Sequence, residues 1–199
     1  MKKILLLAGI FSAAASHSAF ADMPFNGFIG LNLGATQVLY QDPLDKEYLP
    51  TFHGKFGFEG GIKFGDILNV YNIGATAFYD NALSRNADSD SAHSIGLSSI
   101  GVGYSAFGAT VDNYVRVNES GNSSLYLIGG AGVANLTQTI TMKAGGASVD
   151  VKQDATALVL RLGGIYNFDE HMGITMGTKV MFPNGITTIN YEIGVRYTF

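Results

Sequence analysis

Apolar residues alternate with polar or small ones along most of the chain, which is the period of a β-strand with two different faces. The last ten residues, NYEIGVRYTF, show the pattern clearly: Tyr191, Ile193, Val195, Tyr197 and Phe199 are separated by polar or tiny residues. The same alternation recurs earlier, in residues 27–40, 54–66, 69–80, 109–117, 125–133, 156–168 and 171–182. The pattern therefore predicts eight strands.

The connections between these strands differ in length. Short ones fall at residues 65–68, 118–122 and 169–170, and longer polar ones at 41–53, 80–93 and about 139–150. Outer-membrane barrels have this asymmetry, with short periplasmic turns and longer outer loops. The link FPNGIT at 182–187 is short where a long loop is expected, although Asn-Gly is a favourable hairpin turn.

One segment leaves the number of strands open. In SIGLSSIGVGYSAFG the alternation changes phase near Ser99. Residues 94–105 are therefore either a bulged extension of the fourth strand or an extra hairpin. The second interpretation would give a barrel of ten strands.

The polar faces of the strands carry charges of both signs. They are Lys55, Glu59, Lys63, Asp112, Arg116, Arg161, Lys179, Glu192 and Arg196. Compensated charges can persist in an interior where isolated ones would be costly. We therefore predict an interior charge network facing the lumen, with opposite charges paired within Lys55/Glu59/Lys63, Asp112/Arg116 and Glu192/Arg196.

Aromatic residues bracket several of the apolar faces, as in the pairs Tyr71 and Tyr79, Phe56 and Phe64, and Tyr191 and Phe199. Eight residues of strand span roughly 26 Å, or about 20 Å along the barrel axis at a tilt of about 40°. This height is close to the roughly 25 Å apolar band between the aromatic girdles of an outer-membrane barrel. The spacing favours a transmembrane barrel over a soluble, lipocalin-like one.

The N-terminus has the three parts of an export signal. Lys2 and Lys3 precede an apolar run, Ile4 to Phe11, and Ala19-Phe20-Ala21 forms a small-x-small cleavage site. The run is too short for a membrane-spanning helix, which needs about 20 residues. We expect residues 1–21 to be a signal peptide and residues 22–199 to form one barrel domain, since only a closed barrel can cross a membrane with strands.

Composition narrows the function classes. Charged residues make up 14% of the chain, against about 25% in typical soluble domains. The net charge of -4 gives no sign of nucleic-acid binding. The absence of cysteine removes disulfides, thiolate metal sites and cysteine nucleophiles together.

With the segments GGAGVAN, YNFDEHMGITMG and EIGVRYTF, the chain resembles the small outer-membrane β-barrel proteins of Gram-negative bacteria, the OmpA/OmpX/opacity-like or porin-family group. The resemblance implies an antiparallel up-and-down barrel of eight strands, surrounded by outer-membrane lipid and lipopolysaccharide. It also implies insertion by the barrel-assembly machinery, which reads the C-terminal strand. Tyr197 and Phe199 would then form part of an assembly signal.

The residues give little support for catalysis. His53, His93 and His171 fall at strand ends or in loops, where solvated polar residues are expected. His93-Ser94 near Asp88 and Asp90 suggests a hydrolase, but the His-x-Ser pattern of barrel deacylases is missing. The acidic groups around Asp42 and Asp88 lack the spacing of a calcium loop. We therefore predict no enzyme, no metal and no cofactor.

Two function classes remain. An eight-stranded barrel leaves an interior that side chains fill, so the inner charges are expected to form a plug. The first class is a monomeric structural or adhesive surface protein whose outer loops contact envelope or host molecules. The alternative is a narrow passive porin, which a ten-stranded barrel would favour. A lipid-modifying enzyme at the rim ranks below both.

Overall fold

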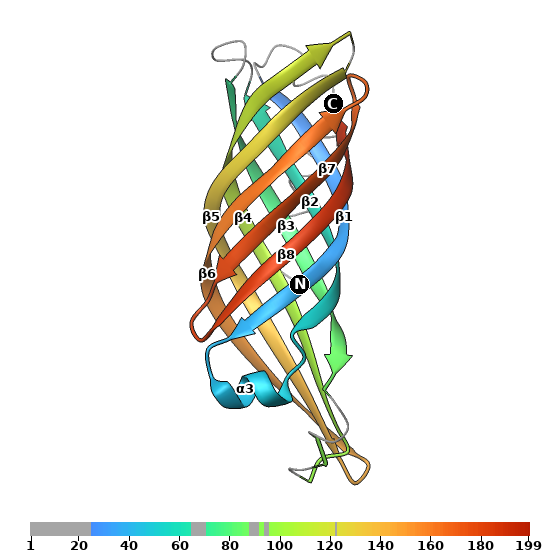
Figure 1. The fold of residues 1–199 in the computed structure, drawn as a ribbon, viewed down its shortest axis with the longest axis vertical. Helices are drawn as coiled ribbons and strands as arrows, with labels where there is room; N and C mark the ends of the chain where they lie inside the picture. Colours follow the sequence, from blue (N-terminus) through green and yellow to red (C-terminus); the bar gives the residue numbers. More distant parts are fainter. Residues whose placement is uncertain (1–24, 65–70, 88–91, 94–95, 122) are drawn as a thin grey trace.

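Eight antiparallel strands form a closed ring in which each strand pairs with its neighbours in sequence and β8 pairs with β1 (Figure 1). The computed structural model describes residues 25–64, 71–87, 92–93, 96–121 and 123–199. The strands are β1 (Phe25–Tyr40), β2 (Phe52–Phe64), β3 (Tyr71–Asn86), β4 (Ser99–Ser120), β5 (Ser123–Ala144), β6 (Ala147–Asn167), β7 (Met172–Phe182) and β8 (Ile186–Thr198). The all-β, eight-stranded prediction is confirmed. The expected signal peptide, residues 1–21, and the turn at 65–68 lie outside the described residues.

One short helix, α3 (Pro43–Tyr48), lies in the connection between β1 and β2 (Figure 1). Its backbone ends with a hydrogen bond from Leu49 N to the Asp45 carbonyl oxygen. Among the described residues, no helix has the length and apolarity needed to cross a membrane.

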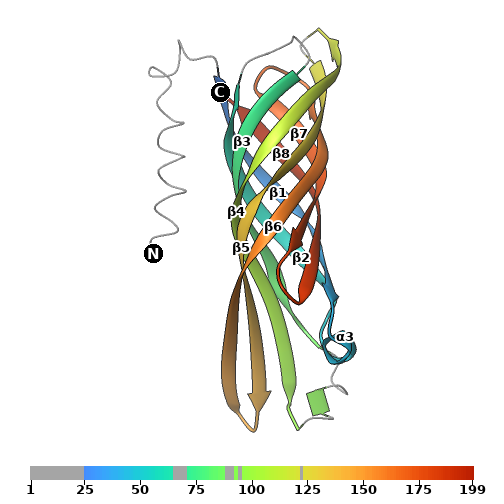
Figure 2. The same cartoon turned by 90° about the vertical axis from the view of Figure 1, so that its left-hand side faces the viewer.

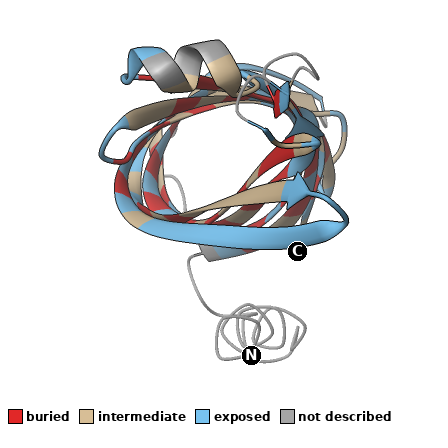
Figure 3. Ribbon diagram, turned by 90° about the horizontal axis from the view of Figure 1, so that it is seen from below, coloured by how far each residue is buried: buried red, intermediate tan, exposed pale blue. Residues whose placement is uncertain are grey.

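The strands have two faces, as their alternation predicts. Leu33, Leu162 and Met176 point outward and are 65%, 70% and 68% exposed. Their polar neighbours point into the lumen and are buried, so buried and exposed positions alternate along the strands (Figure 3). The outer surface is therefore an apolar band that lipid can cover.

Three strands continue beyond the rest of the ring at one end. β4, β5 and β6 form a projecting sheet there, at the end opposite the C-terminus (Figure 2). β5 and β6 stay paired up to Ala144 and Ala147, and the turn between them is Gly145-Gly146, with φ of +54° and +88°. The prediction of a long polar loop at about 139–150 was wrong. Alternating β-branched residues and a two-glycine turn, which allows positive φ at both positions, make this segment a hairpin.

The phase change near Ser99 has a physical cause other than an extra hairpin. Within the apolar band, β4 turns Val111 and Val115 outward. Nearer the projecting end, β4 instead buries Ile100 and Val102 among inward-facing apolar residues. A strand that passes from lipid into water no longer turns its apolar residues outward, because there they would be exposed to water, and buries them on its inner face instead. The extra-hairpin interpretation is therefore wrong.

The connection between β3 and β4 is also shorter than predicted. β3 continues past Asp80 to Asn86 and pairs there with β4, with a register shift between Ala82 and Arg85. The predicted loop at 80–93 is thus strand over its first half. The link at 182–187 is a tight turn, as predicted, and Gly185 has a φ of +84°.

The lengths of the connections indicate which end faces outward. The β6–β7 turn lies at the end that carries the C-terminus, whereas α3 and the projecting sheet lie at the other end. Periplasmic turns are short and outer segments longer in barrels of this kind. We therefore assign the projecting sheet to the cell exterior.

This assignment predicts a labelling pattern, which is simple to read because the chain has no cysteine of its own. Ala147→Cys, at the tip of the hairpin, should react with a membrane-impermeant maleimide on intact cells. Glu170→Cys, in the β6–β7 turn, should react only after the outer membrane has been permeabilised. The opposite pattern would reverse the orientation.

Candidate functional site

Eight charged side chains meet inside the barrel, and each is at most 8% exposed. We call them the interior ion network. Its members are Lys55, Glu59, Asp80, Asp112, Arg161, Lys179, Glu192 and Arg196. They come from β2, β3, β4, β6, β7 and β8 and carry four positive and four negative formal charges. The network is therefore formally neutral.

One half of the network is built around Glu59 and Arg161. The Arg161 guanidinium lies 2.6 Å from a Glu59 oxygen and 3.3 Å from an Asp112 oxygen. Arg196 binds the second Glu59 oxygen at 2.7 Å, and its guanidinium carbon lies 3.7 Å from the centre of the Phe28 ring. Both oxygens of Glu59 are thus engaged by guanidinium groups.

The other half consists of two lysines and two acids. The Lys55 amino group lies 2.9 Å from Asp80 and 2.5 Å from Glu192. The Lys179 amino group lies 2.9 Å and 3.2 Å from the same two acids, and 4.3 Å from the Phe78 ring centre. Each lysine therefore bridges two carboxylates, and each carboxylate is shared by two lysines.

Glycines make room for three acidic members of the network. The residues directly across the ladder from Glu59, Asp80 and Asp112 are Gly30, Gly57 and Gly130, and a Cβ at each would contact the acidic side chain. At Gly130, an added Cβ would lie 3.0 Å from the Val111 carbonyl oxygen and 3.1 Å from the Asp112 carboxyl carbon. A larger residue there would push the carboxylate out of its place.

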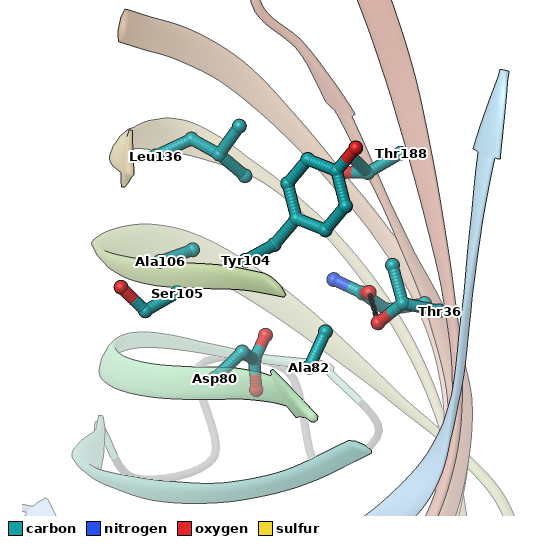
Figure 4. Close-up of a pocket in the computed structure, with 9 residues that line it drawn as sticks. Thr36, Asp80, Ala82, Tyr104, Ser105, Ala106, Leu136 and Thr188 are labelled. Atoms are coloured by element: carbon teal, nitrogen blue, oxygen red, sulfur yellow. Dashed lines mark hydrogen bonds between the residues drawn. The ribbon is translucent and has the colours of Figure 1, made fainter. Parts of the chain in front are cut away.

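Two small cavities lie beside the network among the described residues. One small cavity, on the side of the network toward the projecting sheet, is lined by Thr36, Asp80, Tyr104 and Thr188 (Figure 4). Another, toward the other end of the barrel, is lined by Tyr114 and Arg196 among others. Both are on the scale of single water molecules. Thr188 Oγ1 and Arg196 Nε have no protein partner among the described residues, and ordered water would suit them.

The structure places seven of the nine predicted charged residues in this network, and two elsewhere. Arg116 lies near the β4–β5 turn, where it pairs with Glu119 at 2.9 Å. The Lys63 amino group lies 4.6 Å from the centre of the Tyr126 ring. Both side chains belong to the end of the barrel that carries the short turns, where Lys63 lines the same small cavity as Arg196. Their part in the network stays a prediction.

The predicted pairings within single strands were also wrong. Residues four apart on a strand are separated by about 13 Å along it, which is too far for Glu192 and Arg196 to pair. Instead, Glu192 binds Lys55 and Arg196 binds Glu59, across the lumen or between strands. A strand pattern shows which charges face inward but not which of them meet.

Sequence reasoning missed Asp80, because the second loop was predicted to begin there. A signal was present. Asp80 follows Asn72 and Thr76 at even spacing on β3, and both of these are buried in the lumen. The alternation therefore assigned Asp80 to the inner face.

His53 and His171 have different surroundings in the described part of the chain. His53 is only 2% exposed, so its expected solvation was wrong: its ring nitrogens each lie 3.1 Å from a backbone oxygen, of Leu83 and Pro50. His171 lies 2.9 Å from the Thr198 carbonyl oxygen and stacks on Tyr197. His93 is exposed, and its neighbours Ser94, Asp88 and Asp90 lie outside the described residues. The described residues contain no cluster of three or more His, Asp or Glu suited to a metal ion.

The turn before β7 is held by a carboxylate. The backbone N–H groups of Met172 and His171 donate to Asp169 at 2.6 and 2.7 Å. These hydrogen bonds hold the pKa of the Asp169 carboxyl below its ordinary value. The Phe199 backbone N–H donates to the Gly27 carbonyl oxygen at 3.0 Å, so the last residue still extends the β8–β1 ladder. The role of Tyr197 and Phe199 as an assembly signal stays a prediction.

The closed ring of antiparallel strands with an apolar outer band is typical of transmembrane β-barrel proteins. Comparison with known families agrees with this class. The chain matches the family described as "Outer membrane protein beta-barrel domain" over residues 4–199. It belongs to this family and is a protein of the Gram-negative outer membrane. No protein with a curated description matches it.

Solved structures support the fold. Ail, the attachment invasion locus protein of Yersinia pestis, is 17% identical, with 89% of this chain and 100% of that chain covered and a TM-score of 0.54. Neisserial surface protein A (NspA) is 12% identical, with 87% and 97% covered and a TM-score of 0.51. At these identities the likeness shows the fold alone.

The network predicts unequal effects for two similar substitutions. Glu59→Gln would leave two buried guanidinium groups without their shared counter-charge and should cost about 3–5 kcal/mol of unfolding free energy. Glu119→Gln removes a pair whose acid side chain is 57% exposed, and should cost at most about 1 kcal/mol. Urea unfolding of the refolded protein in lipid vesicles measures both. Equal, small losses would mean that Glu59 is solvated.

The glycines give a matched pair of adjacent variants. Gly130→Ala should cost about 1–3 kcal/mol because its methyl group would displace Asp112. At Gly129 an added Cβ would meet only a Leu162 methyl group, at 3.8 Å, so Gly129→Ala should be nearly neutral. Temperature-dependent gel mobility of the two variants distinguishes them. Equal melting would show that Gly130 is not needed to seat the carboxylate.

Proposed function

We propose that the protein is a surface interaction protein, in which the barrel is a membrane anchor and the projecting sheet makes the contacts. The interior ion network is the observation that carries this proposal. It lies in the lumen at the level of the apolar band, its eight members are buried, and their formal charges compensate one another.

A passive pore needs a continuous aqueous path, and the network stands in its way. Eight strands give a ring just wide enough for side chains to fill. Moving Arg161 aside would separate it from both Glu59 and Asp112, and breaking a buried pair is strongly unfavourable. These observations favour an anchor over a narrow porin.

The outer end, by contrast, offers a rigid surface. Thr137 and Thr141 of β5 donate hydrogen bonds to Asp154 and Asp150 of β6 at 2.5 and 2.7 Å. Behind the strands, apolar residues such as Val102 and Leu136 are buried in a core at the mouth of the barrel. The sheet thus presents polar groups outward and is supported from within.

The charge of the outer end restricts what it can bind. Ail has been solved in complex with a heparin analogue, sucrose octasulfate. Binding of a polyanion requires clustered basic residues. Segments 41–51, 83–98 and 137–157 here contain seven acidic and four basic residues. We therefore propose a ligand other than a sulfated polysaccharide, such as a protein surface.

The test combines conductance with cell binding. The refolded protein should give no conductance steps in a planar bilayer. A variant with residues 138–153 replaced by Gly-Gly, which joins the paired residues Thr137 and Asp154, should keep the barrel and its temperature-dependent gel mobility. Cells that express it should bind host cells less than cells with the intact chain.

Steady ion conductance through the intact protein would contradict the proposal and support the porin. Unchanged cell binding after the hairpin is shortened would show that the projecting sheet is not the contact surface.

A further inference from the structure

The outer part of β6 has one edge that no described strand pairs with. β6 pairs with β5 along its whole length, from Ala147 to Asn167. Its pairing with β7, however, begins only at Leu158, opposite Phe182. Residues 147–157 therefore project with a free edge, which Figure 2 shows at the side of the hairpin. Its length is about 35 Å at the usual rise per residue.

The backbone groups that face this edge can be assigned. Phe168 N donates to the Met172 carbonyl oxygen, so even-numbered residues of this strand direct their peptide groups toward β7. Neither ladder of β6 contains a register shift. Ser148, Asp150, Lys152 and Asp154 therefore direct N–H and C=O groups to the free edge, where they can pair with another strand.

The two faces beside this edge differ in polarity. Val149 and Val151 are 57% and 37% exposed and share a face with Ile140 and Met142 of β5. Asp150, Lys152 and Asp154 point to the opposite face. An incoming strand must therefore match an apolar face, a polar face and a row of backbone groups at once.

We propose that this edge pairs antiparallel with the same edge of a second copy of the chain, with Val151 of each copy on the two-fold axis. The proposal rests on the function proposed above and names its partner.

Geometry limits the possible registers. The faces and backbone groups of the two copies match only when odd-numbered residues lie opposite odd-numbered ones and even-numbered residues opposite even-numbered ones. The numbers of two opposed residues must therefore have an even sum. The partner's turn, which begins at Gly145, must also stay opposite unpaired residues, because β7 occupies the edge from Leu158 onward. The deepest register that satisfies both conditions opposes Gly145 to Ala157 and Val151 to Val151.

Charge selects the same register. It opposes Asp150 of each copy to Lys152 of the other, which makes two complementary cross-strand pairs. In the neighbouring register with less overlap between the two strands, Asp150 lies opposite Asp150. In the neighbouring register with more overlap, Lys152 lies opposite Lys152 and the turn of the partner runs into β7. The edge is therefore complementary to itself in one allowed register.

The symmetry of this pairing places the two copies in different membranes. Antiparallel strands point their barrels in opposite directions, so two edges paired in this way join two facing outer membranes. One short strand pair is a small, weak interface. Many such pairs between two cell surfaces act together, and their avidity can hold cells to one another.

The test is a charge exchange between two variants, each expressed on cells that lack the wild-type chain. Asp150→Lys opposes lysines in the proposed register, and Lys152→Asp opposes aspartates. Wild-type cells should aggregate in a settling assay, and each variant population alone should not. A mixture of the two populations should aggregate again, because each Lys then faces an Asp.

A proline variant tests the backbone pairing separately. Ser148→Pro removes one N–H directed to the free edge, which an edge strand can tolerate, and should lower aggregation. Ser148→Ala keeps that N–H and should aggregate like wild type. Surface labelling at equal expression confirms that each variant has reached the outer membrane.

Aggregation of either single charge variant at the wild-type level would overturn the proposal. So would a mixture that aggregates no better than its parts, since the edge would then bind a different partner. Absence of wild-type aggregation would also overturn it. None of these results bears on conductance or on binding to host cells, so the proposed surface function is tested independently.

Discussion

Lipid offers a peptide group no hydrogen-bond partner, and most of this architecture follows from that constraint. Strands that cross the membrane must close into a ring, and β8 meets β1 to close it here. A ring of eight strands has a narrow lumen that must be filled. In this chain it is filled by charges that compensate one another, and glycines such as Gly57 and Gly130 leave room for the acids opposite them.

The same strands serve two solvents along their length. Inside the apolar band, β4 turns Val111 and Val115 to lipid, and its polar residue Asp112 faces the network. Beyond the band the surroundings are aqueous, and β4 buries Ile100 and Val102 instead. This reversal gives the outer end a small core of its own, and that core allows β4, β5 and β6 to continue as a sheet. The part of the strands that faces lipid and the part that projects into water are therefore distinct regions of one set of strands.

The sequence could predict the features that follow from the alternation of apolar and polar residues. Alternation specified the eight strands and the inward direction of Glu59, Arg161 and Lys179. It could not predict contacts between strands, so the pairs proposed within single strands were wrong. It also failed where the environment changes. The reversal near Ser99 imitated an extra hairpin, and the polar residues around Thr141 and Asp150 imitated a loop because both faces of that hairpin lie outside lipid.

The central claim is that the network closes the lumen to bulk water. Nuclear magnetic resonance of the protein in lipid bilayers tests it through the exchange of guanidinium N–H protons with solvent. Arg161 and Arg196 should give persistent N–H signals at neutral pH, because carboxylates hold them in a buried site. Arg85, whose hydrogen bond to the Phe52 carbonyl oxygen is exposed, should exchange rapidly and is the internal control. Exchange at Arg161 as fast as at Arg85 would mean an open, water-filled lumen and would contradict this account.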